Sequence, residues 1–257
     1  MILAILQARM SSTRLPGKVL APLHGKPMML RQIERASRAL SFDKLLVATS
    51  DQADDDPVAA ACAEAGIACF RGSLHDVLDR FHQAAAPYAP SHIVRLTADC
   101  PLADWTVIDR AVEHAVSGGY AYVSNVFPPS WPHGLDLEVV TFEALETAWR
   151  EAALPSEREH VLPFVHKRPE RFPRGNIAFG EDLSHMRWTV DEPADLEFVR
   201  AVYDALYPGD PAFTTADVIA YLLDHPEVAA INAGPGRDEG YKKSLLADQA
   251  FLREGDA

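Results

Sequence analysis

The chain has 257 residues, of which 48% are hydrophobic and 24% are charged, and its formal net charge is −13. This composition is typical of a folded globular protein and excludes intrinsic disorder. The excess of acids also excludes a non-specific nucleic-acid binder and disfavours a membrane surface as partner, because both roles require a basic surface.

The sparse cysteines and the apolar stretches bear on the cellular compartment. The three cysteines form no C-x-x-C pair, which is typical of reduced thiols in the cytoplasm. No apolar stretch approaches the length of a bilayer span, and the run at residues 2–6 is too short for a signal peptide. We therefore expect a cytoplasmic protein without a membrane segment.

The first half of the chain alternates between strand-like and helix-like segments. Strands are expected at residues 2–6, 44–50, 67–70, 92–96 and 120–123, and helices at residues 28–40, 54–66, 75–86 and 104–116. Such alternation predicts βαβ units and right-handed crossovers. The expected fold class is therefore α/β, with a mostly parallel twisted sheet between two layers of helices.

The rhythm changes beyond about residue 125, where a proline-rich loop begins. A half-exposed strand is expected at residues 134–140 and another strand at 187–190, with helices at 141–153, 156–167, 192–207 and 215–224. The polar tail, residues 232–257, gives no prediction. The simplest reading is one domain over residues 1–257 with an insertion around residues 125–185.

The loop after the first strand carries three cations and no acid, although the protein is acidic overall. Arg9, Arg14 and Lys18 lie there with small hydroxyl residues and Gly17 between them. Open α/β sheets bind ligands beyond the carboxyl ends of their strands. Guanidinium forks, an ammonium group and backbone N–H groups all suit phosphate oxygens. The loop therefore predicts a triphosphate site, and the alternative is a set of solvated surface cations.

Two common phosphate-binding motifs fail on spacing. A Walker A loop needs a glycine at position 12 and a Ser or Thr after Lys18, but these positions hold Ser12 and Val19. A G-x-G-x-x-G dinucleotide fingerprint is absent from this loop. A triphosphate bound by this loop would therefore need a different kind of motif.

The sequence resembles the cytidylyltransferases that make CMP-activated sugar acids, and is most similar to the branch of spore coat polysaccharide biosynthesis protein F. The resemblance rests on QARMSSTRLPGKVL, GKPM, RGSLHDVLDRF, RLTADCPL, GLDLEV, EREHV, RWTVDEPADLEFV and RDEGYKKSL, and covers nearly the whole chain. It implies a glycosyltransferase-A-like nucleotidyltransferase fold, CTP and a sugar acid as substrates, Mg²⁺ as cofactor and a role in surface polysaccharide synthesis. It also implies that two copies can pair as a homodimer.

The resemblance further implies a set of residues around the nucleotide. We expect Gln7, Ala8, Arg9, Ser11, Arg14, Lys18, Arg71, Ser73, Thr97, Ala98 and Asp99 to bind it. Among these, the three cations of the first loop would stabilise charge on the leaving pyrophosphate, and Arg71 and Ser73 would lie near the base. Asp99 and Asp191 match the metal-binding aspartates. The alternative for both acids is a helix N-cap, because a helix-starting proline follows each of them.

On the acceptor side, Asp136 and Glu138 alternate onto one face of an expected strand. The resemblance places this stretch near the second substrate, whereas the alternative is a strand whose acids face water. His160 would contact substrate or act as a base. The alternative is that this histidine has only a structural role.

Two other functions remain open from the sequence. A sugar-1-phosphate nucleotidyltransferase that uses another NTP would need a second basic cluster, for which Arg158, Lys167 and Arg168 are candidates. A nucleotide-binding module without chemistry would keep the phosphate loop but would not need both Asp99 and Asp191.

Overall fold

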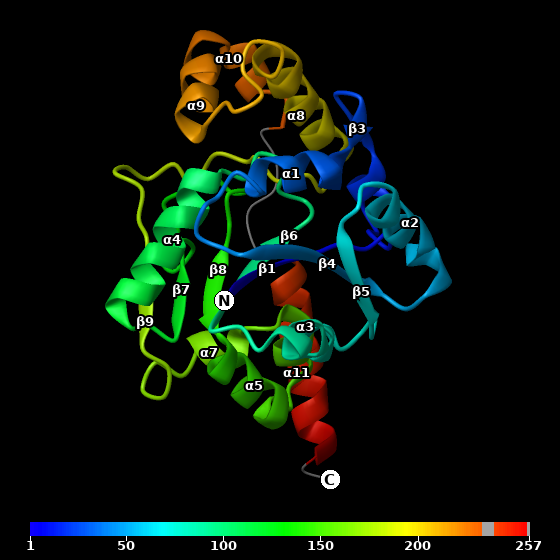
Figure 1. Cartoon of the computed structure of the whole chain (residues 1–257), viewed down its shortest axis with the longest axis vertical. Helices are drawn as coiled ribbons and strands as arrows, with labels where there is room; N and C mark the ends of the chain where they lie inside the picture. Colours follow the sequence, from blue (N-terminus) through cyan, green and yellow to red (C-terminus); the bar gives the residue numbers. More distant parts are fainter. Residues whose placement is uncertain (233–238, 256–257) are drawn as a thin grey trace.

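A seven-stranded sheet forms the centre of the protein in a computed structural model that describes residues 1–232 and 239–255 (Figure 1). The strand order is β5-β4-β1-β6-β8-β7-β9. The strands are β1 (Ile2–Gln7), β4 (Lys44–Ser50), β5 (Ala68–Gly72), β6 (His92–Thr97), β7 (Tyr122–Ser124), β8 (Glu138–Thr141) and β9 (Arg174–Asn176). β5, β4, β1 and β6 are parallel, and β8 runs antiparallel to both β6 and β7. The expected mostly parallel sheet is confirmed.

Helices connect the strands and cover the sheet. They are α1 (Met28–Ala36), α2 (Asp56–Glu64), α3 (Val77–Ala85), α4 (Trp105–Gly118), α5 (Phe142–Glu151), α6 (Pro155–His160), α7 (Pro163–His166), α8 (Pro193–Leu206), α9 (Thr215–Asp224), α10 (Pro226–Ala229) and α11 (Glu239–Gly255). The 3₁₀ turns η1 (Lys18–Leu20), η2 (Ala53–Asp55) and η3 (Ala86–Tyr88) and the short hairpin of β2 (Pro22–Leu23) and β3 (Lys26–Pro27) complete the elements.

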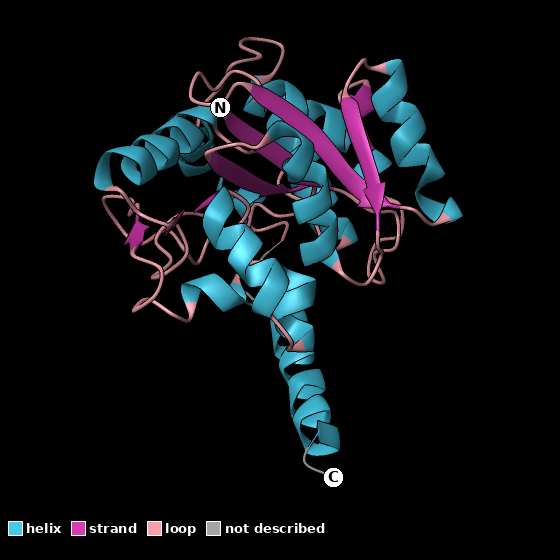
Figure 2. Cartoon of the chain, turned by 60° about the horizontal axis from the view of Figure 1, so that its bottom comes forward, coloured by secondary structure: helices cyan, strands magenta, loops and turns pink. Residues whose placement is uncertain are grey.

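The alternation of side chains along β1 builds two cores, one on each face of the sheet. Leu3 and Ile5 belong to one core, and Ala4 and Leu6 to the other, and all four are fully buried. The first core contains residues of α3, α5 and α7, and the second contains residues of α1, α2, α4 and α8. Figure 2 shows helices on both sides of the strands. The result is the expected three-layer α/β architecture.

Three expectations from the second half of the chain are wrong. Residues 187–190 are not a strand, because Trp188 N donates to His133 O and Val190 N donates to Asp99 O, which lie in two different segments. The helix expected at 156–167 is broken into α6 and α7, since Val161 has φ of +73° and Pro163 lacks an N–H group. The strand expected from residue 134 begins only at Glu138.

Helices from the last part of the chain lie on opposite sides of the sheet. Figure 1 shows α8, α9 and α10 at the top and α11 at the bottom, beside α3 and α5. The tail that gave no sequence prediction thus contains a 17-residue helix that packs on α6. Arg237, at the start of the last stretch that carries the resemblance, lies outside the described residues.

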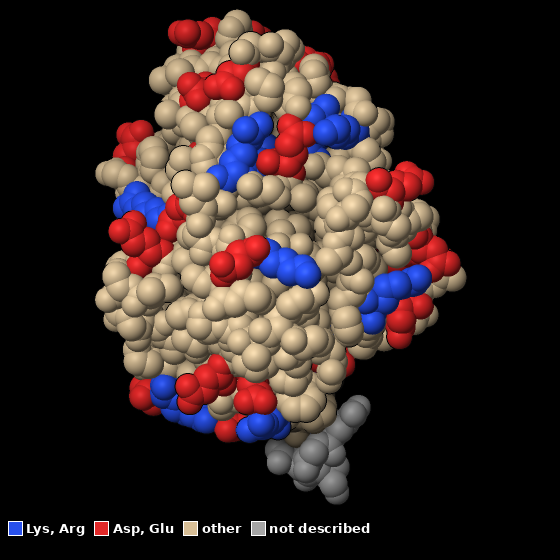
Figure 3. Space-filling model, viewed as in Figure 1, with Lys and Arg blue, Asp and Glu red and all other residues tan. Residues whose placement is uncertain are grey.

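Surface charge and helix hydropathy can be described for the part of the chain that the structure covers. On the face shown in Figure 3, basic side chains lie beside acidic ones and form no extended basic patch. None of the helices in the described part of the chain combines the length and the hydropathy that crossing a bilayer requires.

Candidate active site

The loop after β1 is held in place by a buried carboxylate. Asp55 on η2 is 1% exposed. One of its oxygens accepts a hydrogen bond from Met10 N at 2.6 Å, and the other accepts from the backbone and hydroxyl of Ser50 at the end of β4. Gly17 N closes the loop onto Met10 O, and the φ of Gly17, +73°, is a conformation that favours glycine. The sequence analysis missed Asp55, which fixes the shape of the loop.

Lys18 joins this loop to two acids that lie far away in the sequence. Its Nζ is 2.9 Å from Asp191 Oδ1 and 3.4 Å from Asp99 Oδ2. It also donates to the backbone carbonyl of Val190 at 2.7 Å. Both carboxylates therefore converge on one buried ammonium group.

The ion pairs with Lys18 shift the pKa values of the residues that form them. Burial acts to raise the pKa of Asp99, but Lys18 and the hydroxyl of Thr97 outweigh it and lower that pKa to about 2. Burial acts to lower the pKa of Lys18, and the charges of Asp99 and Asp191 outweigh it and raise that pKa. Asp99 and Lys18 are therefore both charged at neutral pH.

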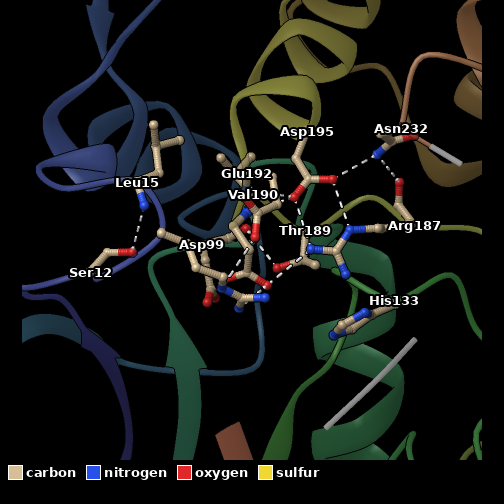
Figure 4. Close-up of polar contacts among 12 residues, drawn as sticks. Ser12, Leu15, Asp99, His133, Arg187, Thr189, Val190, Glu192, Asp195 and Asn232 are labelled. Carbon is tan, nitrogen blue, oxygen red and sulfur yellow. Dashed lines mark hydrogen bonds and ion pairs between the residues drawn. The ribbon is translucent and has the colours of Figure 1, made fainter. Parts of the chain in front are cut away.

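Asp191 is oriented by two arginines as well as by Lys18. Its Oδ2 lies 3.0 Å from Arg14 Nη2 and 3.1 Å from Arg187 Nη2. Arg187 in turn makes two hydrogen bonds of 2.8 Å to Asp195, which is 1% exposed. Figure 4 shows Arg187 beside Asp195, with Asn232 donating to both Asp195 and the backbone carbonyl of Arg187.

The two acids are not the helix caps that the sequence left open. The N-cap of α4 is Asp104, whose side chain accepts from Thr106 N, and the N-cap of α8 is Glu192. Asp99 and Asp191 each precede such a helix but direct their oxygens to Lys18.

The loop, Asp99 and Asp191 surround a cavity of about 640 Å³. Most residues of the expected nucleotide set line it: Gln7, Arg9, Ser11, Arg14, Lys18, Thr97, Ala98 and Asp99. Ala8, Arg71 and Ser73 are absent from this lining. The guanidinium of Arg71 instead binds the carbonyls of Ser50 and Gln52 and the carboxylate of Asp56, and so ties β5 to the end of β4 and the start of α2.

A second cavity of about 410 Å³ adjoins the first, and Thr97 lines both. The three expected acceptor-side residues, Asp136, Glu138 and His160, line this second cavity. Glu138 is held by Arg95 and by the hydroxyl of Tyr122, which donates at 2.7 Å. The carboxylate therefore has a fixed orientation on β8.

Several lining residues escaped the sequence analysis. Arg95 and Tyr241 line the second cavity, whereas Glu159, Ser244 and Ala247 line the first. Arg95 gave a usable signal, because a charged residue in the middle of a buried strand such as HIVRL needs a polar partner. Tyr241 and Ser244 of α11 lie in RDEGYKKSL, one of the stretches that carry the resemblance, but nothing in that stretch assigned them to a cavity.

The donor set fits Mg²⁺ held jointly by protein and substrate. The described residues contain no cluster of three or more His, Cys, Asp or Glu side chains arranged around a metal. Mg²⁺ is commonly bound by one or two carboxylates together with substrate phosphates and water. Asp99 and Asp191 supply two hard oxygen donors within reach of one cation, as their shared contact with Lys18 demonstrates.

Comparisons with known proteins agree with this geometry. The sequence profile of the cytidylyltransferase family matches residues 3–205. Spore coat polysaccharide biosynthesis protein SpsF of Bacillus subtilis is 34% identical over 241 residues, which cover 89% of this chain and 96% of that protein. The resemblance inferred from the sequence motifs is therefore confirmed.

Solved structures lead to the same family. A cytidylyltransferase from Leptospira borgpetersenii superposes with a TM-score of 0.84 at 30% identity, covering 89% of this chain and 96% of that one. A CMP:2-keto-3-deoxy-manno-octonic acid synthetase in complex with CTP shares the fold, with a TM-score of 0.59 at 18% identity over 79% of this chain and 98% of that one. From the fold, the site and these relatives, the chain belongs to the cytidylyltransferase family.

Proposed function

We propose that the protein transfers CMP from CTP to the hydroxyl of a sugar acid and releases pyrophosphate. The acceptor oxygen attacks the α-phosphorus in line, the bond to the β-phosphate oxygen breaks, and the hydroxyl proton leaves to a base. The observation that carries the proposal is the convergence of Lys18, Asp99 and Asp191 at the cavity that adjoins a second cavity. This arrangement suits two substrates that meet at a phosphate.

The first cavity provides the charge that a triphosphate needs. Arg9, Arg14 and Lys18 line it and would neutralise the phosphates and the charge that develops on pyrophosphate. Asp99 and Asp191 are the residues that would hold Mg²⁺, which supplies charge neutralisation at the phosphate oxygens. The contribution of this chain is thus positioning and electrostatics rather than covalent chemistry.

The second cavity supports a polyhydroxylated acid as acceptor. Asp136, Glu138 and His160 offer hydrogen-bond partners for hydroxyl groups. Arg95 lines this cavity and is paired with Glu138, but its buried Nε has no hydrogen-bond partner among the described residues and leaves a donor for a carboxylate. The name of the Bacillus relative supports a role in making a surface polysaccharide.

A sugar-1-phosphate acceptor is less well supported. It would need a second cluster of available cations, but Arg158 is bound to Asp76 and to the carbonyl of Trp149, and Arg168 to Glu157. None of Arg158, Lys167 and Arg168 lines the second cavity.

The test is a panel assay of pyrophosphate release. CTP, UTP, GTP and ATP are each combined with keto-deoxy sugar acids of eight and nine carbons and with sugar 1-phosphates, in the presence of Mg²⁺. The proposal predicts turnover with CTP and a sugar acid, and loss of turnover in Asp99→Asn. Turnover only with a sugar 1-phosphate would favour the alternative enzyme. Tight CTP binding without turnover across the panel would favour a nucleotide-binding module.

A further inference from the structure

The C-terminal helix α11 reaches both cavities although it lies outside the segment that matches the family profile. Tyr241 lines the second cavity, and Ser244 and Ala247 line the first. These positions are three residues apart, so that they lie on one face of the helix. This face of α11 therefore forms part of the wall of both cavities.

The helix is anchored on α6 by a buried polar pair. Asp248 is 6% exposed and accepts hydrogen bonds from Ser156 N at 2.8 Å and from Ser156 Oγ at 2.6 Å. This carboxylate satisfies two donors in the first turn of α6, where backbone N–H groups lack helical partners. The anchor lies one helical turn from Ser244, which is therefore held close to α6.

Ser244 stands between an acid and a histidine of α6. Its hydroxyl donates to Glu159 Oε2 at 2.6 Å, and its oxygen lies 2.9 Å from His160 Nε2. A hydroxyl has one proton. If that proton goes to the carboxylate, the oxygen must accept from Nε2–H, and Nδ1 of His160 is left with its lone pair.

Tyr241 adds a second polar group on the acceptor side. Its ring meets the ring of His160 edge-on at 5.0 Å between centroids. Its hydroxyl is buried and has no hydrogen-bond partner among the described residues. A buried hydroxyl without a partner costs free energy, so its place in the wall of a substrate cavity points to a bound group that would satisfy it.

We propose that α11 is part of the acceptor site: the hydroxyl of Tyr241 binds the acceptor, and Ser244 is a positioning residue that fixes the Nε2–H tautomer of His160. The neutral ring then presents Nδ1 as the nitrogen that can accept a proton or a hydrogen bond. This inference deepens the proposed function and rests on it for the identity of the acceptor. The tautomer itself does not depend on which acceptor is used.

The first arm of the test measures the tautomer by ¹⁵N shifts of histidine rings, with His160 assigned by loss of its signals in His160→Gln. Burial lowers the pKa of His160, against the charge of Glu159, and the ring is neutral near pH 7.5. Arg95 and Arg9 also favour the neutral ring, whereas Glu138 opposes it.

The His160 ring of the wild type should carry its proton on Nε2. Ser244→Ala should show a mixture of tautomers, and Ser244→Thr should restore the wild-type shifts.

Ser156→Ala serves as the matched structural control, because it weakens the anchor of α11 without removing a group that contacts His160. Its His160 shifts should stay close to those of the wild type. A wild-type ring protonated on Nδ1, or identical shifts in Ser244→Ala and the wild type, overturns the role of Ser244.

The second arm compares Tyr241→Phe with the wild type by thermal unfolding and steady-state kinetics. Removing a hydroxyl without a protein partner should leave Tm unchanged or slightly higher, while KM for the acceptor rises by roughly 3- to 10-fold and KM for CTP stays the same. An unchanged acceptor KM overturns the role of Tyr241. If the wild type turns over no acceptor in the panel, the proposed function has failed, and the tautomer measurement alone decides the inference about α11.

Discussion

The ammonium group of Lys18 lies 2.9 Å from a carboxylate oxygen of Asp191, across 173 positions of sequence. This contact brings the loop after β1 against the segment that precedes α8. Asp99, which follows β6, completes the group at 3.4 Å. Three separate parts of the chain therefore build one compact charged centre, and the predictions below follow from it.

Lys18→Met should abolish most of the activity. The substitution preserves much of the side-chain length but leaves Asp99 and Asp191 without their shared cation and the phosphates without a positive partner. We expect kcat/KM for CTP to fall by roughly 100-fold or more, as for the loss of other preorganised charges in active sites. Lys18→Arg should also have low activity, because a planar guanidinium does not reproduce the contacts of an ammonium group with Asp99, Asp191 and Val190 O. Pyrophosphate release measures the activity of both variants. Near-wild-type activity in Lys18→Met would show that Lys18 has no role in catalysis.

Asp55→Asn should loosen the phosphate loop. An amide cannot accept from both Met10 N and the Ser50 donors as the carboxylate does, so one buried donor loses its partner. The cost is roughly 1–3 kcal/mol of unfolding free energy, and KM for CTP should rise. The neighbouring Asp54 is exposed, so Asp54→Asn is a matched control that should change neither quantity. Urea unfolding and steady-state kinetics provide the two readouts, and equal behaviour of the two variants would contradict this role of Asp55.

Arg187→Gln should destabilise the fold as well as the site. It leaves the carboxylate of Asp195 buried without its main partner, which typically costs 3–5 kcal/mol. The exposed pair of Arg150 and Glu146 gives a control, since Arg150→Gln should cost roughly 0.5 kcal/mol or less. Thermal unfolding should therefore show a large fall in Tm for Arg187→Gln and almost none for Arg150→Gln. Comparable Tm values for the two variants would show that the buried pair has little energetic weight.

The ion pair of Asp99 predicts a specific dependence of stability on pH. Its pKa falls from an ordinary value of 3.8 to about 2 in the folded protein, where Lys18 and Thr97 overcome the effect of burial. Because the folded pKa is the lower one, this stabilisation is present above pH 4 and is lost as pH falls toward 2.

The measurement compares the wild type with Asp99→Asn by urea unfolding at several pH values. The difference in unfolding free energy, of the order of 2 kcal/mol from the pKa shift, should narrow between about pH 4 and pH 2. A difference that stays constant over this range would mean that the carboxylate is not stabilised by its ionised partners.

The sequence predicted the parts of the fold that depend on local patterns. The strand at residues 44–50 and the helix at 215–224 have the expected bounds, since a buried apolar run and regular apolar spacing act locally. Residues 187–190 look like a strand by composition but bind two separate segments instead of a neighbouring strand. These hydrogen bonds depend on backbone groups far away in the sequence, so no local pattern can predict them.

The same division holds for the site. Arg9, Arg14 and Lys18 were found because three cations in one loop of an acidic protein form a local signal. Asp99 and Asp191 required the family motifs, and only the structure shows that Lys18 joins them.

Supporting residues were not found from the sequence. Asp55 and Ser244 act through contacts with segments remote in sequence, and each looks like an ordinary polar residue in its own surroundings. Asp195 binds Arg187, which lies eight positions before it and outside its own helix. Arg71 differs from the loop cations, because its guanidinium binds the backbone carbonyls of Ser50 and Gln52 and does not line the first cavity.

The most direct test of the central claim is a crystal structure with Mn²⁺ and a non-hydrolysable CTP analogue, in which anomalous scattering locates the metal. The account predicts one ion bound to both Asp99 and Asp191 and to phosphate oxygens, with Arg9 and Arg14 on the triphosphate. A metal bound elsewhere, or a triphosphate that lies outside the cavity lined by the first loop, would contradict it.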